Sequence, residues 1–455
     1  MEIHIMSTRM DNIYQPSLFT QNTLRMDVVV THGNRYRILA EKLPWMQLAE
    51  VANNHRSKKV DIHNGRPLDL RLHLGALISQ SMNRWTDRDT EEMVLLNAGV
   101  RLLCGLEQSA DTIDRTSIEA FRNQLGTDGV EAINKIVVHS AKEAGFTDGA
   151  LCSSDTTVQE APIAYPTEVG HMKNISEKLF GIGSRMKKGL SKTLLTLSME
   201  AQRIFTKIRL FTRGSDEKTI KQKKKLGKAL QKTVAKMERL VREEFERLGS
   251  LSQVKYREQL ELYKKMLSQI RYWMRTGFHR PGKIVSLWAL DARAIMRNKA
   301  GKMTEFGRRW IITKLTAGYI IGKVCKKLGS DSDTGLMPEI LENFKLNLGT
   351  NPKMVVYDRG GDGRKNHRIL KQEKIRNCIF RKGKESQPGL GRNTQAKARR
   401  ERALSEAVIA TIKNPRFGFN KPRAKSSETI VLKGHAAILG ANLAHLARDW
   451  GATVM

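Results

Sequence analysis

The alternation of short apolar runs with amphipathic segments in the last third of the chain constrains the fold most strongly. The runs WIIT and YIIGKV are joined by a turn that contains Gly318, which predicts a β-hairpin. A later segment has helical spacing and ends at Gly349, a residue type common at helix ends. The elements expected in chain order are a hairpin at 305–325, a helix at 336–350, strands at 352–358 and 374–380, and a helix from about 397 to 413. This order predicts an α/β fold, a mixed sheet with helices packed upon it.

The first 145 residues have a different character. Residues 1–45 show little regularity, whereas from Trp45 to about Gly145 apolar residues recur at helical spacing, which predicts an all-α module. The expected helix boundaries are N-caps at Asp87 or Asp89 and at Asp114 or Thr116, and a helix end at Gly126.

An extended segment and a basic segment lie between these two parts. Residues 149–172 are rich in Thr, Val and Ile, and Pro162 and Pro166 exclude a long helix there. From about Met172 to Arg275, Lys and Arg surround an apolar stripe, which predicts amphipathic helices, such as a long antiparallel hairpin. The basic face is either solvated surface or a DNA contact.

The charge balance points to a polyanionic partner. The chain has 80 Lys and Arg against 46 Asp and Glu, for a net charge of +34. Each cation that neutralises a phosphate releases condensed counterions, so such a charge favours nucleic acid. A ribosomal-type RNA binder and a membrane-surface protein remain as alternatives on charge alone.

Cysteine usage and hydropathy favour an intracellular protein. The four cysteines form no CxxC or Cys/His cluster, which disfavours a zinc site and a disulfide framework, and they are expected to be buried. We find no basic-then-apolar leader, and the mildest candidate for a membrane span, residues 436–447, is shorter than the roughly 20 apolar residues required.

Two aspartates stand where an α/β sheet can bind a ligand. Asp358 ends the predicted strand VVYD before Arg-Gly-Gly, and strand ends border the crevice where such sheets bind ligands. Asp155 has a similar extended context, with Glu160 and Glu168 as weaker substitutes. Each aspartate could equally be a turn or cap residue.

One face of the last predicted helix of the sheet region carries a charged row. Arg402, Glu406 and Lys413 fall together at 3.6 residues per turn, whereas Glu401 lies well round the helix and is a poor substitute for Glu406. An ordinary amphipathic helix with an Arg–Glu pair is the alternative. The residues expected to pack on the sheet are Leu404, Val408 and Ile412.

Several segments occur in an order that resembles a known family. They are DTTVQEAPIAYPTEVGHM, KAGKMTEFGRRWIIT, PKMVVYDRGG, IRNCIFRKGK and RALSEAVIATIKNPRFGFNK. This series resembles bacterial insertion-sequence DDE transposases with an RNase-H-like, retroviral-integrase-like catalytic core. The upstream segment DRDTEEMVLLNAGVRLLCGLEQSADTIDRTSIEAFRNQLG resembles the helical domain that precedes that core.

The resemblance extends to the helix signature Y-x2-R-x3-E-x6-K of the family. Arg402, Glu406 and Lys413 match it, whereas Arg399 stands in place of the tyrosine. Gly361 replaces the aromatic residue usual after Asp-Arg-Gly. These departures affect auxiliary DNA contacts and leave the three carboxylates in place.

The resemblance implies two-metal phosphoryl transfer. Asp155, Asp358 and Glu406 would be the catalytic residues and the ligands of two Mg²⁺ or Mn²⁺ ions, hard cations that prefer oxygen. Asp155 would bridge both ions, and each of the other two carboxylates would favour one. The expected phosphate-binding residues are Arg402, Lys413, Arg359 and Arg399.

The same resemblance implies a domain plan and partners. Cleavage would free a 3′-hydroxyl at the transposon end, which the same site would join to target DNA. The partners would be double-stranded DNA, as terminal inverted repeats and target, and a second copy of the chain on DNA, with no membrane, in a cytoplasmic, nucleoid-associated location. Arg66, Arg71 and Arg84 are candidate contacts to the repeat. The expected parts are a helical DNA-binding domain at 1–145, the first core strand at 146–171, a basic helical insertion at 172–280, and the rest of the core with its C-terminal helix at 281–455.

Two other functions remain open. An RNase-H-type nuclease without strand transfer would use the same site but has no need of a large helical N-terminal module. A basic nucleic-acid-binding structural protein would carry the three carboxylates by accident, and then they should lie far apart in the fold.

Overall fold

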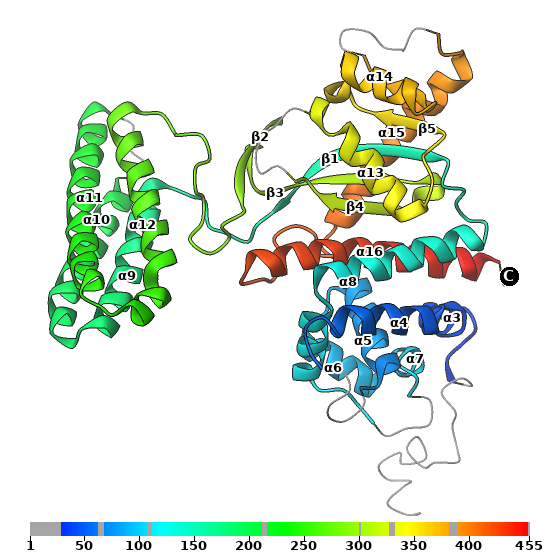
Figure 1. The fold of residues 1–455 in the computed structure, drawn as a ribbon, viewed down its shortest axis with the longest axis horizontal. Coiled ribbons are helices and arrows are strands. Elements are labelled where there is room, and N and C mark those ends of the chain that lie inside the picture. Colours follow the sequence, from blue (N-terminus) through cyan, green and yellow to red (C-terminus); the bar gives the residue numbers. More distant parts are fainter. Residues whose placement is uncertain are drawn as a thin grey trace, which may run out of the picture. The chain divides into compact units, whose positions relative to one another are not determined.

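The computed structural model describes residues 29–61, 68–106, 111–211, 216–299, 302–326, 333–381 and 389–453. The chain forms two compact units (Figure 1). Unit 1 comprises Met1–Pro162 and Gly307–Met455, and unit 2 comprises Ile163–Phe306. The division of the chain into four parts made from the sequence stays a prediction.

The N-terminal part of unit 1 is helical, as predicted. Its helices are α3 (Arg35–Lys42), α4 (Trp45–Arg56), α5 (Leu70–Asn83), α6 (Asp87–Leu96), α7 (Ala98–Leu103) and α8 (Arg115–Glu143). The lead-in expected to be irregular therefore already contains α3.

One helix boundary in this part differs from those expected. Helix α6 is capped by Thr86, which shares a capping box with Asp89, because the Thr hydroxyl and the Asp carboxylate each accept a backbone N–H of the other residue. Asp114 caps α8, as predicted. The helical span Arg115–Glu143 is interrupted at Gly126, whose φ of 67° and ψ of −172° are not helical, so a first helix ends at this glycine, as predicted, and a second helix follows it.

A mixed β-sheet lies mainly in unit 1. Its strands are β1 (Leu151–Glu160), β2 (Arg293–Lys299), β3 (Lys302–Lys314), β4 (Ile320–Val324), β5 (Met354–Tyr357) and β6 (Arg376–Ile379). Strand β2 and the first residues of β3 fall within the residue range of unit 2. The order is β2-β3-β1-β5-β6, with β4 also paired to β3. Strand β1 runs antiparallel to β3 and parallel to β5, and β5 runs parallel to β6. The predicted hairpin and both predicted strands are confirmed, and the fold class is mixed α/β.

Four helices accompany the sheet (Figure 1). They are α13 (Met337–Leu348), α14 (Arg364–Gln372), α15 (Arg392–Lys413) and α16 (Ser427–Ala452), with short 3-10 turns at Thr316–Gly318, Asp333–Gly335 and Arg359–Gly361. Gly349 closes α13 with a φ of 77°, as predicted. Helix α14 was not predicted, because in a stretch this basic only Asn366 and Leu370 are buried. Strand β2 was also missed.

Helix α16 is the central helix of unit 1 and packs against α8, α5, α3 and β4. Its Asn442 locks this arrangement: the side-chain amide donates to Asn134 Oδ1 at 2.8 Å and to the Ile320 carbonyl at 2.7 Å, and Oδ1 accepts from Ile320 N at 2.9 Å. The helix α16 is longer than the apolar stretch 436–447 recognised in the sequence, and by length and composition it could cross a membrane. In the structure, 83% of its most apolar 18-residue stretch is buried inside the protein.

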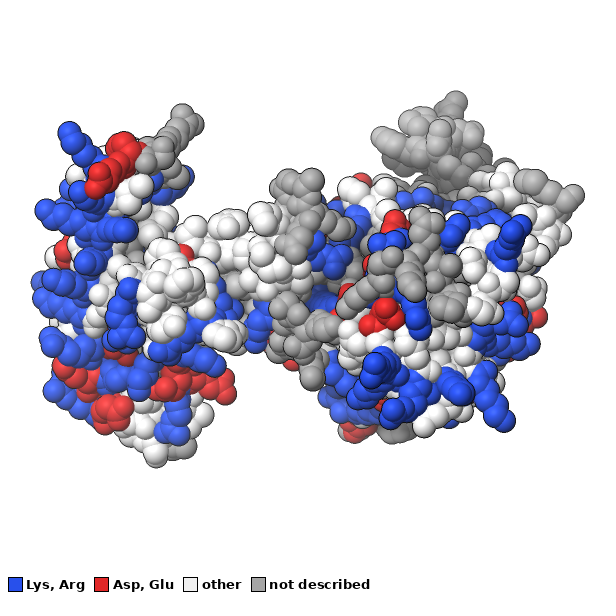
Figure 2. Space-filling model, turned by 90° about the horizontal axis from the view of Figure 1, so that it is seen from above, with Lys and Arg blue, Asp and Glu red and all other residues white. Residues whose placement is uncertain are grey.

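Unit 2 contains four helices around an apolar core rather than a single hairpin. They are α9 (Glu168–Met186), α10 (Ser191–Leu210), α11 (Glu217–Glu246) and α12 (Ser250–Thr276), with a short 3-10 turn at Lys188–Leu190. In α11 the buried stripe runs from Leu230 through Val234 and Met237. The opposite face is exposed and basic, and Figure 2 shows Lys and Arg crowding the surface of this unit. Amphipathic helices, as predicted, account for both faces.

All four cysteines are buried and none forms a disulfide, which agrees with their expected role as small apolar residues. They are Cys104, Cys152, Cys325 and Cys378.

Candidate functional site

The pairing of β1 with β5 brings two of the candidate carboxylates together. Ser154 is the parallel partner of Tyr357, so the next residues, Asp155 and Asp358, occupy adjacent positions on neighbouring chain segments. Neighbouring strands lie about 4.8 Å apart, and side chains alternate between the two faces of a sheet. Asp155 therefore shares a face with Ser153, and that face carries α15.

Two buried polar contacts hold α15 on this face. The hydroxyls of Ser405 and Ser153 lie 2.7 Å apart, and Glu401 pairs with Lys314 of β3 through a hydrogen-bonded ion pair. The Lys314 side chain is only 3% exposed. Glu401, a poor substitute for Glu406 by its helical position, therefore has a structural role. That role follows from a strand far away in sequence, so no local signal predicted it.

The helix is rotated relative to the prediction. Its buried residues are Ala398, Ser405 and Ile412. The prediction for Ile412 is confirmed, but Leu404 is 40% exposed and does not pack on the sheet. At 100° per residue, the Ser405 side lies between the Leu404 face and the charged row. The sheet contact thus sits to one side of Arg402 and Glu406, which leaves both at its edge.

Arg402 joins two of the candidate carboxylates. Its Nε lies 3.2 Å from Asp358 Oδ1 and its Nη2 lies 3.4 Å from Glu406 Oε1. The guanidinium also lies 5.5 Å from the centre of the Phe380 ring. From the sequence, Arg402 was expected to hold a phosphate; in this structure it bridges the carboxylates. Glu406 and Asp358, 48 positions apart in the chain, therefore lie within reach of one side chain.

The environments of the two aspartates differ. Asp155 is half-buried, and its Oδ1 accepts the backbone N–H of Thr156 at 2.7 Å. Asp358 Oδ1 is buried without a hydrogen bond among the described residues, so its contact with Arg402 is ionic. Burial raises the pKa of Tyr357 far above its usual value, and the negative charges of Asp155 and Asp358 add to that shift while Arg309 opposes it.

The three candidate carboxylates have the ligand chemistry, but not the close grouping, of a site for a divalent cation. Two Asp and one Glu supply the carboxylate oxygens that Mg²⁺ prefers, and the buried Asp358 Oδ1 lacks a hydrogen bond. Within the described ranges, no three His, Cys, Asp or Glu residues are grouped closely enough to hold a metal ion. Arg402 provides positive charge between Asp358 and Glu406. The carboxylate oxygens are suitable ligands for a hard cation. To bind one together, they require Arg402 to move away and Glu406 to turn toward the aspartates.

The other predicted contacts are spread over the same part of unit 1. Lys413 ends α15, seven residues or about 10 Å beyond Glu406 on the same helix face. Arg399 is exposed on α15, and Arg359 is exposed in the turn after Asp358.

The substitutes for Asp155 have partners of their own. Glu160 lies 3.8 Å from the Lys421 ammonium, and Glu168, in unit 2, pairs with Lys283. Neither lies beside Asp358 in the pairing of β1 with β5. Asp155 is therefore the β1 carboxylate that the register brings to Asp358.

The candidate contacts of the N-terminal part differ in surroundings. Arg71 stacks on Trp45, 3.4 Å from the ring centre, and donates to the Leu103 carbonyl at 2.9 Å, which indicates a structural role. Arg84 is exposed and donates to the Pro415 carbonyl. Arg66 lies outside the described residues.

A further carboxylate, Asp333, lies near the strand ends, and no local sequence pattern singled it out. It forms an ion pair with Arg309 and accepts a hydrogen bond from the Thr156 hydroxyl at 3.2 Å. Thr156 points to the sheet face opposite Asp155. Asp333 therefore belongs to a neutralised pair on the other face and is not a fourth member of the site.

One family model matches part of the chain. Residues 24–124 match the family model described as "Transposase domain (DUF772)". This match supports a transposase-family protein and, in general terms, an enzyme that cleaves DNA. Searches of curated proteins and of solved structures gave no match.

Proposed function

We propose that the chain is a DDE transposase that cleaves transposon ends and joins the freed 3′-hydroxyl to target DNA, with Asp155, Asp358 and Glu406 as catalytic carboxylates. One observation carries this proposal: the β1–β5 register and α15 gather these residues at one edge of a mixed sheet. The match to a transposase domain upstream in the same chain supports it. The mixed sheet with its helices is compatible with an RNase-H-like core.

The proposed chemistry requires the three carboxylates to converge, with Asp155 and Asp358 as ligands from adjacent chain segments and Glu406 as a ligand from α15. Arg402, which pairs with Asp358 and Glu406, has to leave them first. Two Mg²⁺ or Mn²⁺ ions held by these carboxylates would activate the attacking water or 3′-hydroxyl and would neutralise the leaving oxygen. Arg402, released from the carboxylates, binds a DNA phosphate with its planar fork. Arg359, Arg399 and Lys413 hold further phosphates.

The charge of the chain supports DNA as the substrate. The net charge is +34, and the exposed face of α11 is rich in Lys. We infer that the domain matched at 24–124 recognises the terminal inverted repeats and that the protein acts as a dimer on paired ends in the cytoplasm, at the nucleoid. The basic face of α11 contacts the transposon end or a second subunit.

Two other functions are consistent with some of these observations. A structural nucleic-acid binder has no reason to gather Asp358 and Glu406 around one guanidinium, so the geometry argues against it. An RNase-H-type nuclease would use the same site without joining DNA. The transposase-domain match favours the transposase.

The test uses the full chain with Mg²⁺ and oligonucleotides that carry the inverted repeats flanking its gene. Asp358→Asn should abolish end cleavage and leave DNA binding largely intact, because it removes ligand charge without changing size. Glu342→Gln, which also removes one carboxylate charge but at an exposed position on α13, is the matched control and should cleave normally. Unimpaired cleavage by Asp358→Asn, or loss of its DNA binding, would contradict the assignment.

Strand transfer is tested separately. Precleaved ends with a free 3′-hydroxyl are incubated with a target plasmid. Joined product is expected from the wild-type chain and not from Asp358→Asn. Cleavage without joining would instead identify a nuclease.

A further inference from the structure

A cavity in unit 1 is lined by residues other than the three candidate carboxylates. It has a volume of about 540 Å³. Its walls come from the junction of α5 and α6, from α8, from the loop 417–425 and from the first turns of α16. The walls thus join the matched transposase domain to chain segments some 300 positions later.

The lining of this pocket is strongly cationic. Five cations line it against two acids, Asp87 and Glu119. The cations are Arg84, Arg122, Arg423, Lys425 and Lys433. Of these, Arg84, Arg423 and Lys425 are exposed and stand at the rim, whereas Arg122 is buried.

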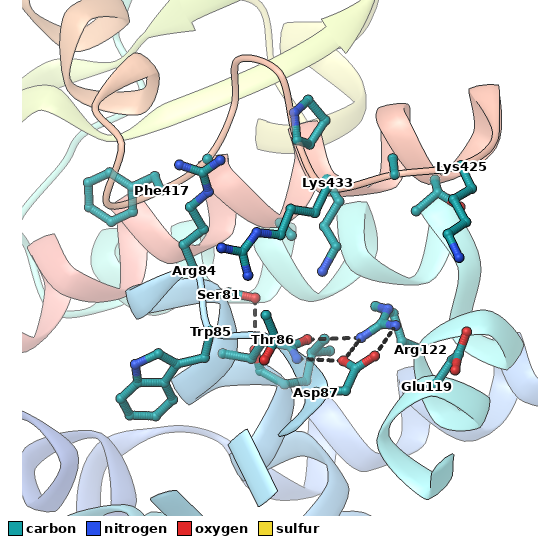
Figure 3. Close-up of a pocket in the computed structure, with 18 residues that line it drawn as sticks. Ser81, Arg84, Trp85, Thr86, Asp87, Glu119, Arg122, Phe417, Lys425 and Lys433 are labelled. Atoms are coloured by element: carbon teal, nitrogen blue, oxygen red, sulfur yellow. Dashed lines mark hydrogen bonds and ion pairs between the residues drawn. The ribbon is translucent and has the colours of Figure 1, made fainter. Parts of the chain in front are cut away.

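The acid at the base of the pocket is already neutralised. Asp87 forms a two-point ion pair with Arg122, whose Nη2 donates to Oδ2 at 2.9 Å, and Gln80 Nε2 donates to its Oδ1 at 2.7 Å. Figure 3 shows this pair with Lys433 reaching toward it from α16. Asp87 therefore has little capacity left to neutralise the other cations.

Lys433 lies inside this lining and has no counterion among the described residues. Desolvation and the positive charge of Arg122 lower its pKa to about 8, with partial compensation by Asp87. Across the described part of the chain, the Lys433 ammonium makes no hydrogen bond or ion pair within 4.0 Å. The Lys433 side chain is half-buried and lines the cavity with its charge unpaired, so an anion that enters from outside can neutralise it.

We propose that this pocket binds a backbone phosphate of double-stranded DNA at a site separate from the catalytic carboxylates. Lys433 contacts the phosphate inside the pocket, and the rim cations Arg423 and Lys425 follow the strand outside it. The choice of DNA over a free phosphate rests on the proposed function, on the net charge of +34 and on these exposed rim cations.

The pocket is also coupled to the catalytic helix through the chain. The loop that forms its wall begins directly after α15, which carries Glu406. Arg84 Nη1 donates to the Pro415 carbonyl at 3.0 Å, and Arg416 Nε donates to the Met82 carbonyl at 3.2 Å. These bonds tie the loop to the end of α5, so a phosphate held here fixes DNA at a defined distance from α15.

The experiment measures binding of a labelled duplex to the full chain by fluorescence anisotropy between 50 and 200 mM NaCl. Lys433→Met keeps the length of the side chain and removes a desolvated charge, so the variant should fold. Lys425→Gln removes a rim charge. Lys345→Met, an exposed cation of α13 in the same unit, is the matched control.

Lys433→Met is expected to weaken duplex binding about 3–10-fold and to reduce the salt slope, d log K/d log [salt], by about 1 in magnitude. Lys425→Gln should act in the same direction, and Lys345→Met should leave both quantities unchanged. Unchanged duplex binding by Lys433→Met overturns the proposal.

Calorimetry with inorganic phosphate and with a nucleoside monophosphate distinguishes the sources of the anion. If Lys433→Met loses binding of these small anions but keeps duplex binding, the pocket holds a free phosphate and the DNA assignment is wrong. Asp358→Asn binds the duplex like the wild type on this proposal. Failure of the catalytic assignment would appear in cleavage, whereas failure of the pocket appears only in binding.

Discussion

Two glutamates on α15 allow the structural role of this helix to be separated from its chemical role. Glu401 is 14% exposed and pairs with Lys314, which is 3% exposed. Glu406 is 60% exposed and pairs with Arg402 one helical turn away. Replacing either one by Gln removes the same charge from the same helix, so each variant is the matched control of the other.

The expected losses of stability differ several-fold. Removing one partner of a buried ion pair leaves an uncompensated charge and costs about 3–5 kcal/mol. Because Glu401 keeps some exposure, we expect Glu401→Gln to lower the free energy of unfolding by about 3 kcal/mol. An exposed pair four residues apart on a helix contributes only about 0.3–0.5 kcal/mol, so Glu406→Gln should be almost as stable as the wild type.

The assay combines urea unfolding, followed by circular dichroism, with Mg²⁺-dependent cleavage of transposon-end DNA. Glu406→Gln should lose cleavage at nearly wild-type stability. Glu401→Gln should lose stability, and the double variant Lys314→Met/Glu401→Leu should recover most of it, because an apolar pair leaves no buried charge. A Glu401→Gln protein as stable as the wild type, or a fully active Glu406→Gln protein, would refute the reasoning.

Three further predictions concern the packing, acid sensitivity and capping of unit 1. A Cβ at Gly440 of α16 would lie 2.1 Å from the Ser81 carbonyl oxygen of α5. Gly440→Ala should therefore lower the free energy of unfolding, measured by urea titration, by about 2–4 kcal/mol. As a control, Gly181→Ala on α9, where no atom lies within 4 Å of the added Cβ, should raise it by about 0.5–1 kcal/mol. A Gly181→Ala protein less stable than the wild type would show that the space around the added Cβ does not decide the sign of the effect. Burial first, and then the charge of Lys323, lower the pKa of His435 to about 4 from 6.5. The unfolded chain therefore binds the extra proton first, so about 3 kcal/mol of stability is present above pH 6.5 and is lost as the pH falls toward 4. His435→Leu should flatten this part of the stability curve between those values, and an unchanged curve would exclude His435 as its cause. Thr86→Ala removes the cap of α6 and should cost about 1 kcal/mol in the same titration, with no loss if the capping box contributes nothing.

Local sequence patterns predicted the elements of the sheet region well. The hairpin at 305–325, the helix closed by Gly349 and the strand before Asp358 depend on turn chemistry and apolar spacing within a few residues. The patterns failed where few residues are buried, as in α14.

The candidate site was only partly predictable. The shared face of Arg402, Glu406 and Lys413 follows from helical geometry alone. The neighbourhood of Asp155 and Asp358 required the register of two strands about 200 residues apart, and sequence order suggested it only through a resemblance. The position of Arg402 between two carboxylates could not be predicted, because it depends on how α15 is rotated on the sheet.

Local sequence patterns indicated most helices and strands of the sheet region and the charged face of α15, because these properties depend on neighbours within one or two turns. The rotation of that helix and the exposure of Leu404 depend instead on the tertiary structure. The rotation is set by the contact of Ser405 with Ser153, 252 residues away, and by the pair of Glu401 with Lys314. The cationic pocket likewise depends on chain segments that meet only after folding. Such contacts depend on the shape and desolvation of distant surfaces, which no local pattern encodes.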